Sequence, residues 1–332
     1  MLEKSYYKYW GKAKKKEIGE GYDYHLLPYH CLDVAAVGRV WLEQDSALCE
    51  RIAFAIGADK SNLFDTIGFF FSLHDLGKFD IRFQSKVPEI RDEIWKELNK
   101  NDLFLTTAQI SEFDHGKAGY EAFIKHFPQL LDIEGIDDDL HDKWKPWIAA
   151  VTGHHGVIPQ NADWHNPSVE SIVFEHERQV RKEWFKTMLS LFDISIINIP
   201  ILSEKPQSFI AGFCSVSDWI ASNELFVRWY KDIIPPDQYY KEAVEHCRQI
   251  DILRQFGIVG CQAAVYKSVN ALLPENTSPR QIQTLIDILP VETGLTIIEG
   301  TTGSGKTEAA LALAWKLIDS GQADSIVFAL PT

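Results

Sequence analysis

Seven histidine and aspartate residues lie in sequence settings that are typical of metal ligands. Imidazole nitrogens suit first-row transition ions such as Mn, Fe, Co, Ni and Zn, whereas Mg prefers oxygen ligands. A carboxylate can bridge two such ions ~3.5–4 Å apart, and the pair lowers the pKa of a bound water and clamps both oxygens of a phosphoester displacement. We therefore predict a two-metal phosphohydrolase site with Asp75 as the bridge. Its predicted ligands are His30, His74, Asp75, His115, His154, His155 and Asp218.

Helical spacing turns three of these side chains toward the core. His30 lies four residues after the apolar Leu26, and His74 and Asp218 follow apolar residues at the same spacing. A buried carboxylate without a partner costs several kcal/mol, so it should be paired with a cation. A lone inward histidine is more often a hydrogen-bonded core residue, and a lone inward aspartate is often a helix-packing acceptor.

Two local patterns favour metal ligands over that alternative. The segment His74-Asp75-Leu-Gly-Lys78 ends a predicted helix with adjacent ligands, and Gly77 suits a C-terminal turn. The segment Gly153-His154-His155-Gly156 is a double histidine between two glycines, and packing rarely requires adjacent histidines. Lys78 is then a catalytic candidate that contacts a substrate phosphate, or else an ordinary lysine at a helix end. His115 is the weakest of the set, because Asp114-His115-Gly116 could equally be a helix-start turn.

A second chemical signal lies near the end of the sequence. Residues 300–307 fit the phosphate-binding pattern GxxxxGK[ST] between a predicted strand and a predicted helix. Backbone N–H groups would cradle the phosphates, Lys306 would reach the β and γ oxygens, and Thr307 would hold Mg. The alternative is a Gly-rich connector. The predicted ATP-binding residues of this loop are Gly300, Thr301, Thr302, Gly303, Ser304, Gly305, Lys306 and Thr307.

The elements that must position these residues are mainly α-helices. Apolar spacing near 3.6 predicts an all-helical domain over residues 1–230, with helices at 26–42, 63–73, 81–98, 119–127, 143–151, 168–192 and 208–230. The acidic stretch 134–142 is expected to be a solvated loop. Residues 231–258 are expected to form a linker or accessory helix. Residues 259–332 change to an α/β pattern, with strands at 295–299 and 325–330 around a helix at 308–318.

Five motifs occur in an order that resembles a known family. They are Tyr29-His-Cys-Leu-Asp-Val-Ala-Ala36, Leu73-His-Asp-Leu-Gly-Lys-Phe-Asp80, Asp114-His-Gly116, Val151-Thr-Gly-His-His-Gly156 and Phe213-Cys-Ser-Val-Ser-Asp-Trp219. The sequence looks like the HD superfamily of metal-dependent phosphohydrolases. It is most similar to the HD nuclease domain of the type I CRISPR-associated helicase–nucleases, and among these to the I-E form.

The resemblance implies how the ligands divide and what the protein does. It implies one ion held by His30, His74, Asp75 and Asp218, and a second held by Asp75, His115, His154 and His155. It also implies an endo- or exonuclease that degrades single-stranded DNA in antiviral defence, with the Cascade surveillance complex and its guide RNA as partners.

The resemblance extends into the start of a RecA-like lobe of a superfamily 2 helicase. Gln283 matches the motif that reads adenine, although an ordinary surface-helix glutamine fits equally well. Ala329-Leu-Pro-Thr332 resembles the next helicase motif, which touches the nucleic-acid strand. The Walker B pair and the second lobe are missing from these residues. We therefore expect this sequence to be a fragment or a truncated form. We expect ATP and Mg to be cofactors of the complete helicase.

Composition excludes several other classes of protein. The net charge of −14 argues against coating nucleic acid by phosphate neutralisation alone. No signal peptide is evident, and no apolar run is long enough for a bilayer, so we expect no membrane partner. The five cysteines form no CxxC pair and suit buried thiols in a reducing cytoplasm.

Two alternatives to the DNA nuclease stay open at this point. An HD phosphohydrolase acting on small nucleotides would use the same ligands, although the phosphate-binding loop argues against it. A non-catalytic module that docks on Cascade would not need the complete ligand set.

Overall fold

The computed structural model describes residues 4–17, 19–95, 105–131, 138–160, 171–229, 233–259, 265–292, 294–323 and 326. The chain forms two compact units, Met1–Val259 and Gly260–Thr332. The first unit is mainly helical, as predicted. Its longer helices are α1 (Leu27–Gln44), α2 (Ser46–Ile56), α3 (Lys60–Phe71), α7 (His115–Leu131), α8 (Asp138–Thr152), α9 (Ser171–Leu191), α10 (Glu204–Ala221) and α11 (Pro236–Gln249).

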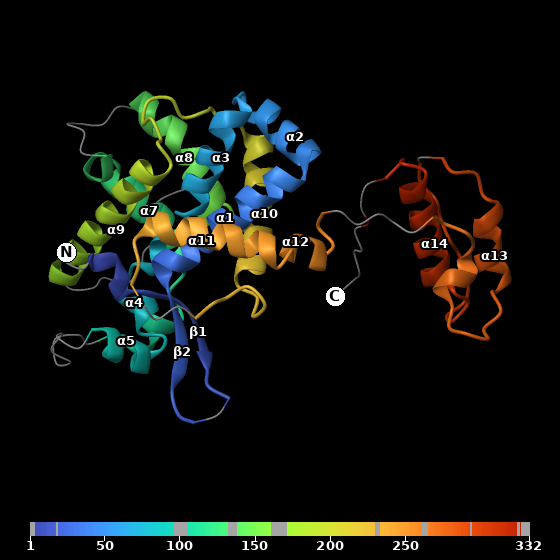
Figure 1. Cartoon of the computed structure of the whole chain (residues 1–332), viewed down its shortest axis with the longest axis horizontal. Helices are drawn as coiled ribbons and strands as arrows, with labels where there is room; N and C mark the ends of the chain where they lie inside the picture. Colours follow the sequence, from blue (N-terminus) through green and yellow to red (C-terminus); the bar gives the residue numbers. More distant parts are fainter. Residues whose placement is uncertain are drawn as a thin grey trace. The chain divides into compact units, whose positions relative to one another are not determined.

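Helix α1 lies at the centre of this unit. It packs against α3, α10 and α11, and Figure 1 shows α11 lying across it. Close packing is possible because α1 carries small residues: a Cβ added at Gly38 would lie 2.8 Å from the Phe71 ring. Around it, α3 and α8 bury aromatic rings, including the stacked pair Phe70–Trp147 with ring centroids 4.6 Å apart. Each such buried ring stabilises the fold by about 1.5–3 kcal/mol.

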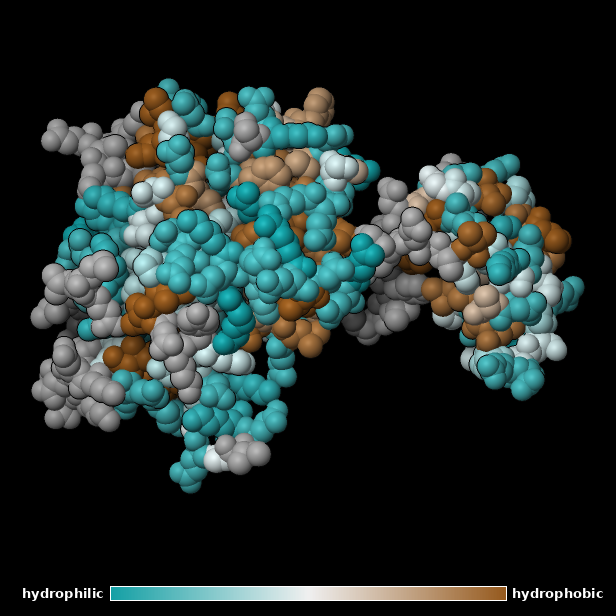
Figure 2. All heavy atoms as spheres, viewed as in Figure 1, coloured by the Kyte–Doolittle hydropathy of each residue, from teal (hydrophilic) through white to brown (hydrophobic). Residues whose placement is uncertain are grey.

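An antiparallel hairpin precedes α1 and corrects the all-helical prediction. Its strands are β1 (Trp10–Lys15) and β2 (Tyr22–Leu26), after the short 3₁₀ helix η1 (Ser5–Lys8). The lysine-rich β1 lacks the alternating apolar pattern that identifies a strand from sequence. The connecting turn uses Gly19 and Gly21, both with positive φ. The hairpin extends away from the helices (Figure 1), and its visible surface is hydrophilic (Figure 2).

Three helix predictions also need correction. The helix predicted over 208–230 is α10, which runs from Glu204 to Ala221, because the Asn223 side chain then accepts from Leu225 N and forms a turn. The helix predicted over 81–98 is divided into α4 (Ile81–Gln84) and α5 (Pro88–Ile94), because the residue before Pro88 cannot readily continue a helix. The stretch predicted as a loop over 134–142 is helical from Asp138, where carboxylates favour the first turn of α8; residues 132–137 lie outside the described residues.

The other short elements of the first unit are η2 (Leu76–Lys78), α6 (Thr107–Ser111) and α12 (Ile252–Gln255). The segment 231–258, predicted as a linker or accessory helix, contributes α11 and α12 to the core of the first unit, with Tyr239 and Ala243 fully buried.

The second unit contains η4 (Val269–Leu272), α13 (Gln281–Ile288) and α14 (Lys306–Asp319) around a small apolar cluster. The strand predicted at 295–299 is wrong for this structure, where these residues form no strand and Leu295 and Ile297 are exposed. A strand needs a hydrogen-bonded neighbour. The segment predicted to supply one, 325–330, lies outside the described residues except for Ile326.

Candidate metal centre

The structure brings all seven predicted ligands together in the first unit. His30 comes from α1, His115 from the first turn of α7 and Asp218 from α10. His74 and Asp75 follow α3, and His154 and His155 follow α8. Three groups of these side chains have ligand atoms within 4.8 Å of one another: His30–His74–Asp75, His115–His154–His155 and His74–His154–Asp218.

Asp75 lies at the middle of the cluster and divides it in two. Its Oδ2 is 3.1 Å from His74 Nε2 and 3.3 Å from His30 Nε2. Its Oδ1 is 3.4 Å from His115 Nε2 and 3.9 Å from His154 Nε2. The two oxygens of one carboxylate therefore face two different sets of imidazoles.

The remaining two ligands, Asp218 and His155, each lie beside one of the two sets. Asp218 Oδ1 is 3.1 Å from His30 Nε2 and 3.9 Å from His74 Nε2. His155 Nε2 is 2.8 Å from His115 Nε2. Asp218 is held in place by Ser222, whose hydroxyl donates to the same oxygen at 2.9 Å.

Local backbone contacts aim two of the rings at Asp75. His74 Nδ1 lies 2.8 Å from the carbonyl oxygen of Phe71, and His154 Nδ1 lies 2.7 Å from that of Val151. A carbonyl can only accept, so each Nδ1 carries the proton and each Nε2 presents a lone pair to the centre. This arrangement is typical of metal-ligating histidines.

Close packing explains the glycines around the ligands. A Cβ at Gly77 would lie 1.9 Å from the carbonyl oxygen of His115, so this glycine lets α7 approach the turn after Asp75. Gly77 does not have the positive φ that a helix C-terminal turn uses, which corrects the reason predicted for it. Gly156 does have a positive φ, of 99°, and Gly153 packs tightly against the backbone of Ile158.

Burial favours the neutral form of four of the five imidazoles. It lowers the pKa of each of the four, and that of His154 falls to about 3. The four are His30, His115, His154 and His155. Neutral imidazole is the form that binds a metal ion.

The two carboxylates are held in the charged form. Burial raises the pKa of Asp75, but the nearby His74 and Lys78 outweigh this effect and hold the pKa well below its usual range. The same holds for Asp218, where the nearby His30 and Lys12 outweigh burial. Charged carboxylates and neutral imidazoles together are a ligand set for cations.

The hydrogen bonding of the centre fits bound cations. Among the described residues, several buried atoms here have no hydrogen-bond partner: the Nε2 atoms of His30, His74 and His154 and Oδ1 of Asp75. Asp75 Oδ2 has only an ion pair with Lys78. A buried polar atom without a partner costs about 1–3 kcal/mol. These atoms point at one another around Asp75, so divalent cations would satisfy them, and the nitrogen-rich set suits a first-row transition ion.

Two lysines contact the carboxylates. Lys78, singled out from the sequence, places its Nζ 2.6 Å from Asp75 Oδ2 and is almost completely buried. Lys12, which sequence reasoning missed, places its Nζ 3.3 Å from Asp218 Oδ1. Burial and the neighbouring Lys78 lower the pKa of Lys12. No sequence signal distinguishes Lys12 from the other lysines of the first 16 residues.

The predicted nucleotide loop has the expected local geometry in the second unit. Gly303 and Gly305 have φ of 74° and 89°, and α14 begins at Lys306 directly after them. A cavity of about 300 Å³ is lined by residues 303–308 together with Gln283. Gln283 is buried, and its side-chain amide donates to the carbonyl oxygen of Gly305 at 3.4 Å. The loop and the predicted adenine-reading glutamine therefore border one cavity.

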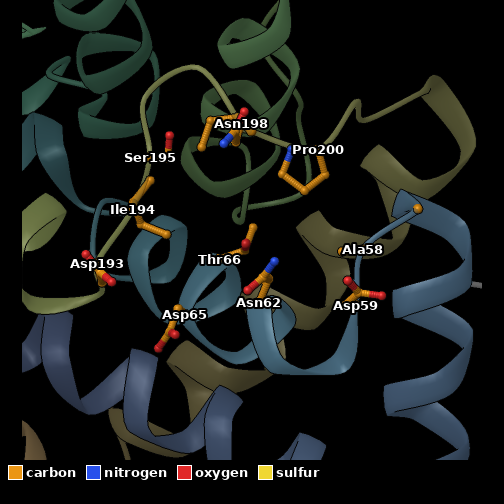
Figure 3. Close-up of a pocket in the computed structure, with 12 residues that line it drawn as sticks. Ala58, Asp59, Asn62, Asp65, Thr66, Asp193, Ile194, Ser195, Asn198 and Pro200 are labelled. Carbon is orange, nitrogen blue, oxygen red and sulfur yellow. The ribbon is translucent and has the colours of Figure 1, made fainter.

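A separate acidic cavity of about 330 Å³ lies beside the N-terminal part of α3 (Figure 3). Asp59, Asp65 and Asp193 line it, and Figure 3 shows their carboxylates around the opening. None of the predicted ligands lines this cavity, so it is not the metal centre. Among the described residues, no helix is long and apolar enough to span a bilayer.

A helical unit that gathers five imidazoles and two carboxylates around one central aspartate has the architecture of the HD phosphohydrolase class. The family model described as "Cas3, HD domain" matches residues 10–227. The chain therefore belongs to the Cas3 HD domain family, the HD nucleases of CRISPR systems.

Individual relatives agree with this family assignment. The chain is 39% identical, over 98% of its length, to the CRISPR-associated endonuclease/helicase Cas3 of Escherichia coli strain K12. It spans 38% of that protein. A crystal structure of a CRISPR-associated protein matches 95% of this chain with a TM-score of 0.62 and 23% identity, and the chain covers 34% of it. A chain of a CRISPR RNA-guided surveillance complex, pre-nicking, matches 94% with a TM-score of 0.53 and 19% identity, and 35% of that chain is covered.

Proposed function

We propose that this chain is the metal-dependent nuclease part of a CRISPR helicase–nuclease and that it hydrolyses phosphodiester bonds of single-stranded DNA. The observation that carries the proposal is the position of Asp75, whose two oxygens face two separate sets of imidazoles. This geometry suits a carboxylate that bridges two cations. A structural aspartate would need hydrogen-bond donors on both oxygens, whereas Oδ1 of Asp75 has none and Oδ2 has only the Lys78 ammonium beside it.

The ligand division implied by the family likeness agrees with these neighbours. His30, His74 and Asp218 would hold one ion with Asp75 Oδ2, and His115, His154 and His155 would hold the other with Oδ1. Bound divalent cations supply activation of water and neutralisation of charge on the phosphodiester. The chain's own part is to keep the rings aimed at Asp75 and buried.

Single-stranded DNA is supported by the surroundings of the centre. Trp219 directly follows the ligand Asp218 on α10, and its side chain is 67% exposed. An exposed aromatic side chain can stack an unpaired base, and such a contact contributes about 1–3 kcal/mol. The relative from E. coli is by name an endonuclease/helicase. A helicase fits this substrate, because it delivers separated strands.

We further propose the surveillance complex Cascade, with its guide RNA, as the partner, in a system of the I-E type. One of the similar structures is a chain of a CRISPR RNA-guided surveillance complex. The nucleotide loop and Gln283 would bind ATP and Mg as part of a superfamily 2 helicase in the complete protein. The place of action would be the cytoplasm, where Cascade meets invading DNA.

The test uses circular single-stranded DNA, which only an endonuclease can open. We expect the purified chain with Mn²⁺, Ni²⁺ or Co²⁺ to cut the circle without ATP, and Asp75→Asn to abolish cutting. Asp65→Asn makes the same change at the acidic cavity and should cut normally. Release of nucleosides from small nucleotides, with the circle intact, would instead support the alternative HD phosphohydrolase. No turnover together with retained binding to Cascade would support a docking module.

A further inference from the structure

The first strand of the hairpin is fixed directly against the metal centre. Gln84 holds Trp10 by two backbone contacts, because Trp10 N donates to Gln84 Oε1 and Gln84 Nε2 donates to Trp10 O, each at 3.0 Å. On the other side, Leu27 N donates to Tyr9 O at 2.8 Å. The chain entering β1 is therefore attached both to the segment after Lys78 and to the start of α1.

The next residue, Gly11, packs closely against the start of α1 and the ligand His30. A Cβ there would lie 3.0 Å from Leu27 Cα and 3.1 Å from His30 Cβ. The Gly11 carbonyl oxygen also accepts from Lys78 Nζ at 3.5 Å. The base of β1 therefore forms one wall of the centre.

Lys12 follows immediately and reaches over that wall to Asp218. Its Nζ lies 3.3 Å from Asp218 Oδ1, the oxygen that also faces His30 and His74. The side chain of Lys12 is 27% exposed, whereas that of Lys78 is only 6% exposed. Of these two lysines, Lys12 is the one that a DNA strand can reach from solvent.

An ammonium beside a carboxylate oxygen opposes a divalent ion at that oxygen, at Asp218 through Lys12 and at Asp75 through Lys78. Both are cations, and like charges at contact distance repel strongly in a partly buried site. The four-carbon stem of lysine lets the ammonium move while its backbone stays fixed. The anion available to receive it is the phosphate of the substrate.

We propose that Lys12 is a substrate-binding residue of this site and contacts a phosphate oxygen of the DNA strand. This inference rests on the proposed nuclease function. With a divalent ion at Asp218, the Lys12 ammonium leaves the carboxylate and binds the phosphate. Lys12 therefore opposes metal binding and favours DNA binding, and its removal changes the two affinities in opposite directions.

The experiment compares Lys12→Gln with Lys14→Gln. Lys14 lies two residues further along the same strand and pairs with the surface carboxylates of Glu17 and Glu224, so the control removes the same charge away from the ligands. Calorimetric titration with Mn²⁺ measures metal affinity. Single-turnover cleavage of a single-stranded oligonucleotide, at several enzyme and salt concentrations, separates DNA affinity from the maximal rate.

We expect Lys12→Gln to bind Mn²⁺ several-fold more tightly and the oligonucleotide about tenfold more weakly. The slope of log affinity against log salt should fall in magnitude by about 0.7, the value for one phosphate contact on a single strand. Lys12→Arg should recover DNA binding, and Lys14→Gln should match the wild type. Matching thermal unfolding curves exclude misfolding as the cause.

Two results would overturn the inference, and they are distinguishable. If the wild type cuts DNA and Lys12→Gln has unchanged DNA affinity and salt slope, the role proposed for Lys12 is refuted and the nuclease function stands. Wild type that binds Mn²⁺ but neither binds nor cuts DNA refutes the nuclease function and the inference together.

Discussion

Acidification should destabilise the protein after its metal is removed with a chelator, and His154 should account for a definite part of the loss. Its ring is almost completely buried, and Nδ1 is committed to the carbonyl oxygen of Val151. Burial, followed by the neighbouring His74, lowers its pKa to about 3. In the unfolded chain the same ring should titrate near its ordinary pKa of about 6.5.

The sign and size of the effect follow from this difference. Between pH 6.5 and about 3 the unfolded state binds the proton and the folded state does not, so lowering the pH favours unfolding. pH 5 lies about 1.5 units below the ordinary pKa of the ring, so the ring is protonated in the unfolded chain. At about 1.4 kcal/mol per unit, His154 removes about 2 kcal/mol of stability at pH 5 relative to pH 7.

The assay is urea unfolding of the wild type and of His154→Asn at pH 7 and pH 5, after a chelator has removed metal ions from both proteins. The asparagine amide can still donate to Val151 O, but it does not titrate, so the variant removes the proton and keeps the hydrogen bond. We expect the variant to lose about 2 kcal/mol less than the wild type between the two pH values. Equal losses in the two proteins would show that His154 is not buried in its neutral form, and the reasoning about this centre would be refuted.

Three further changes test other parts of the structure. Gly77→Ala should push α7 and His115 away from the centre, destabilise the fold by about 1–3 kcal/mol and weaken Mn²⁺ binding in calorimetry. Tyr239→Phe should cost about 1–3 kcal/mol in urea unfolding, because the buried Asp33 loses the hydroxyl that donates to it at 3.0 Å. Lys306→Ala in the complete protein should weaken ATP binding, measured by fluorescence with a labelled nucleotide, and leave ATP-independent cutting of circular single-stranded DNA unchanged. Unaltered ATP affinity would contradict the assignment of the loop.

The helices were predictable where apolar residues repeat with the helical period over a long stretch. α1 and α3 fall close to the predicted ranges because each buries one continuous face. The boundary at Pro88 was missed because the apolar pattern continues through it, although proline alone could have indicated the break. The strand at 295–299 failed for a different reason: its β-type composition describes a strand only when a neighbour pairs with it.

The ligands could be identified by type, but their arrangement could not. Adjacent histidines between glycines and a His–Asp pair are local signals, and all the residues they indicated lie at the centre. The division of Asp75 between two sets of imidazoles depends on where α1, α7 and α8 cross, and nothing in the sequence gives those positions. Gly77 illustrates the same limit, since its missing side chain is required by a contact with α7, 38 residues later in the chain, at His115.

Lys12 shows most clearly what only the fold can specify. Six lysines occur among the first 16 residues, and as a sequence they resemble any solvated basic segment. Pairing of β1 with β2 aligns Trp10 with Leu26 at the base of the hairpin and Lys15 with Tyr22 toward its tip. Only the base is attached to α1 and Gln84, so the lysine that reaches Asp218 is the one nearest to it. Lys12 therefore reaches the site because it lies on β1 two residues after Trp10, the residue that Gln84 holds in place.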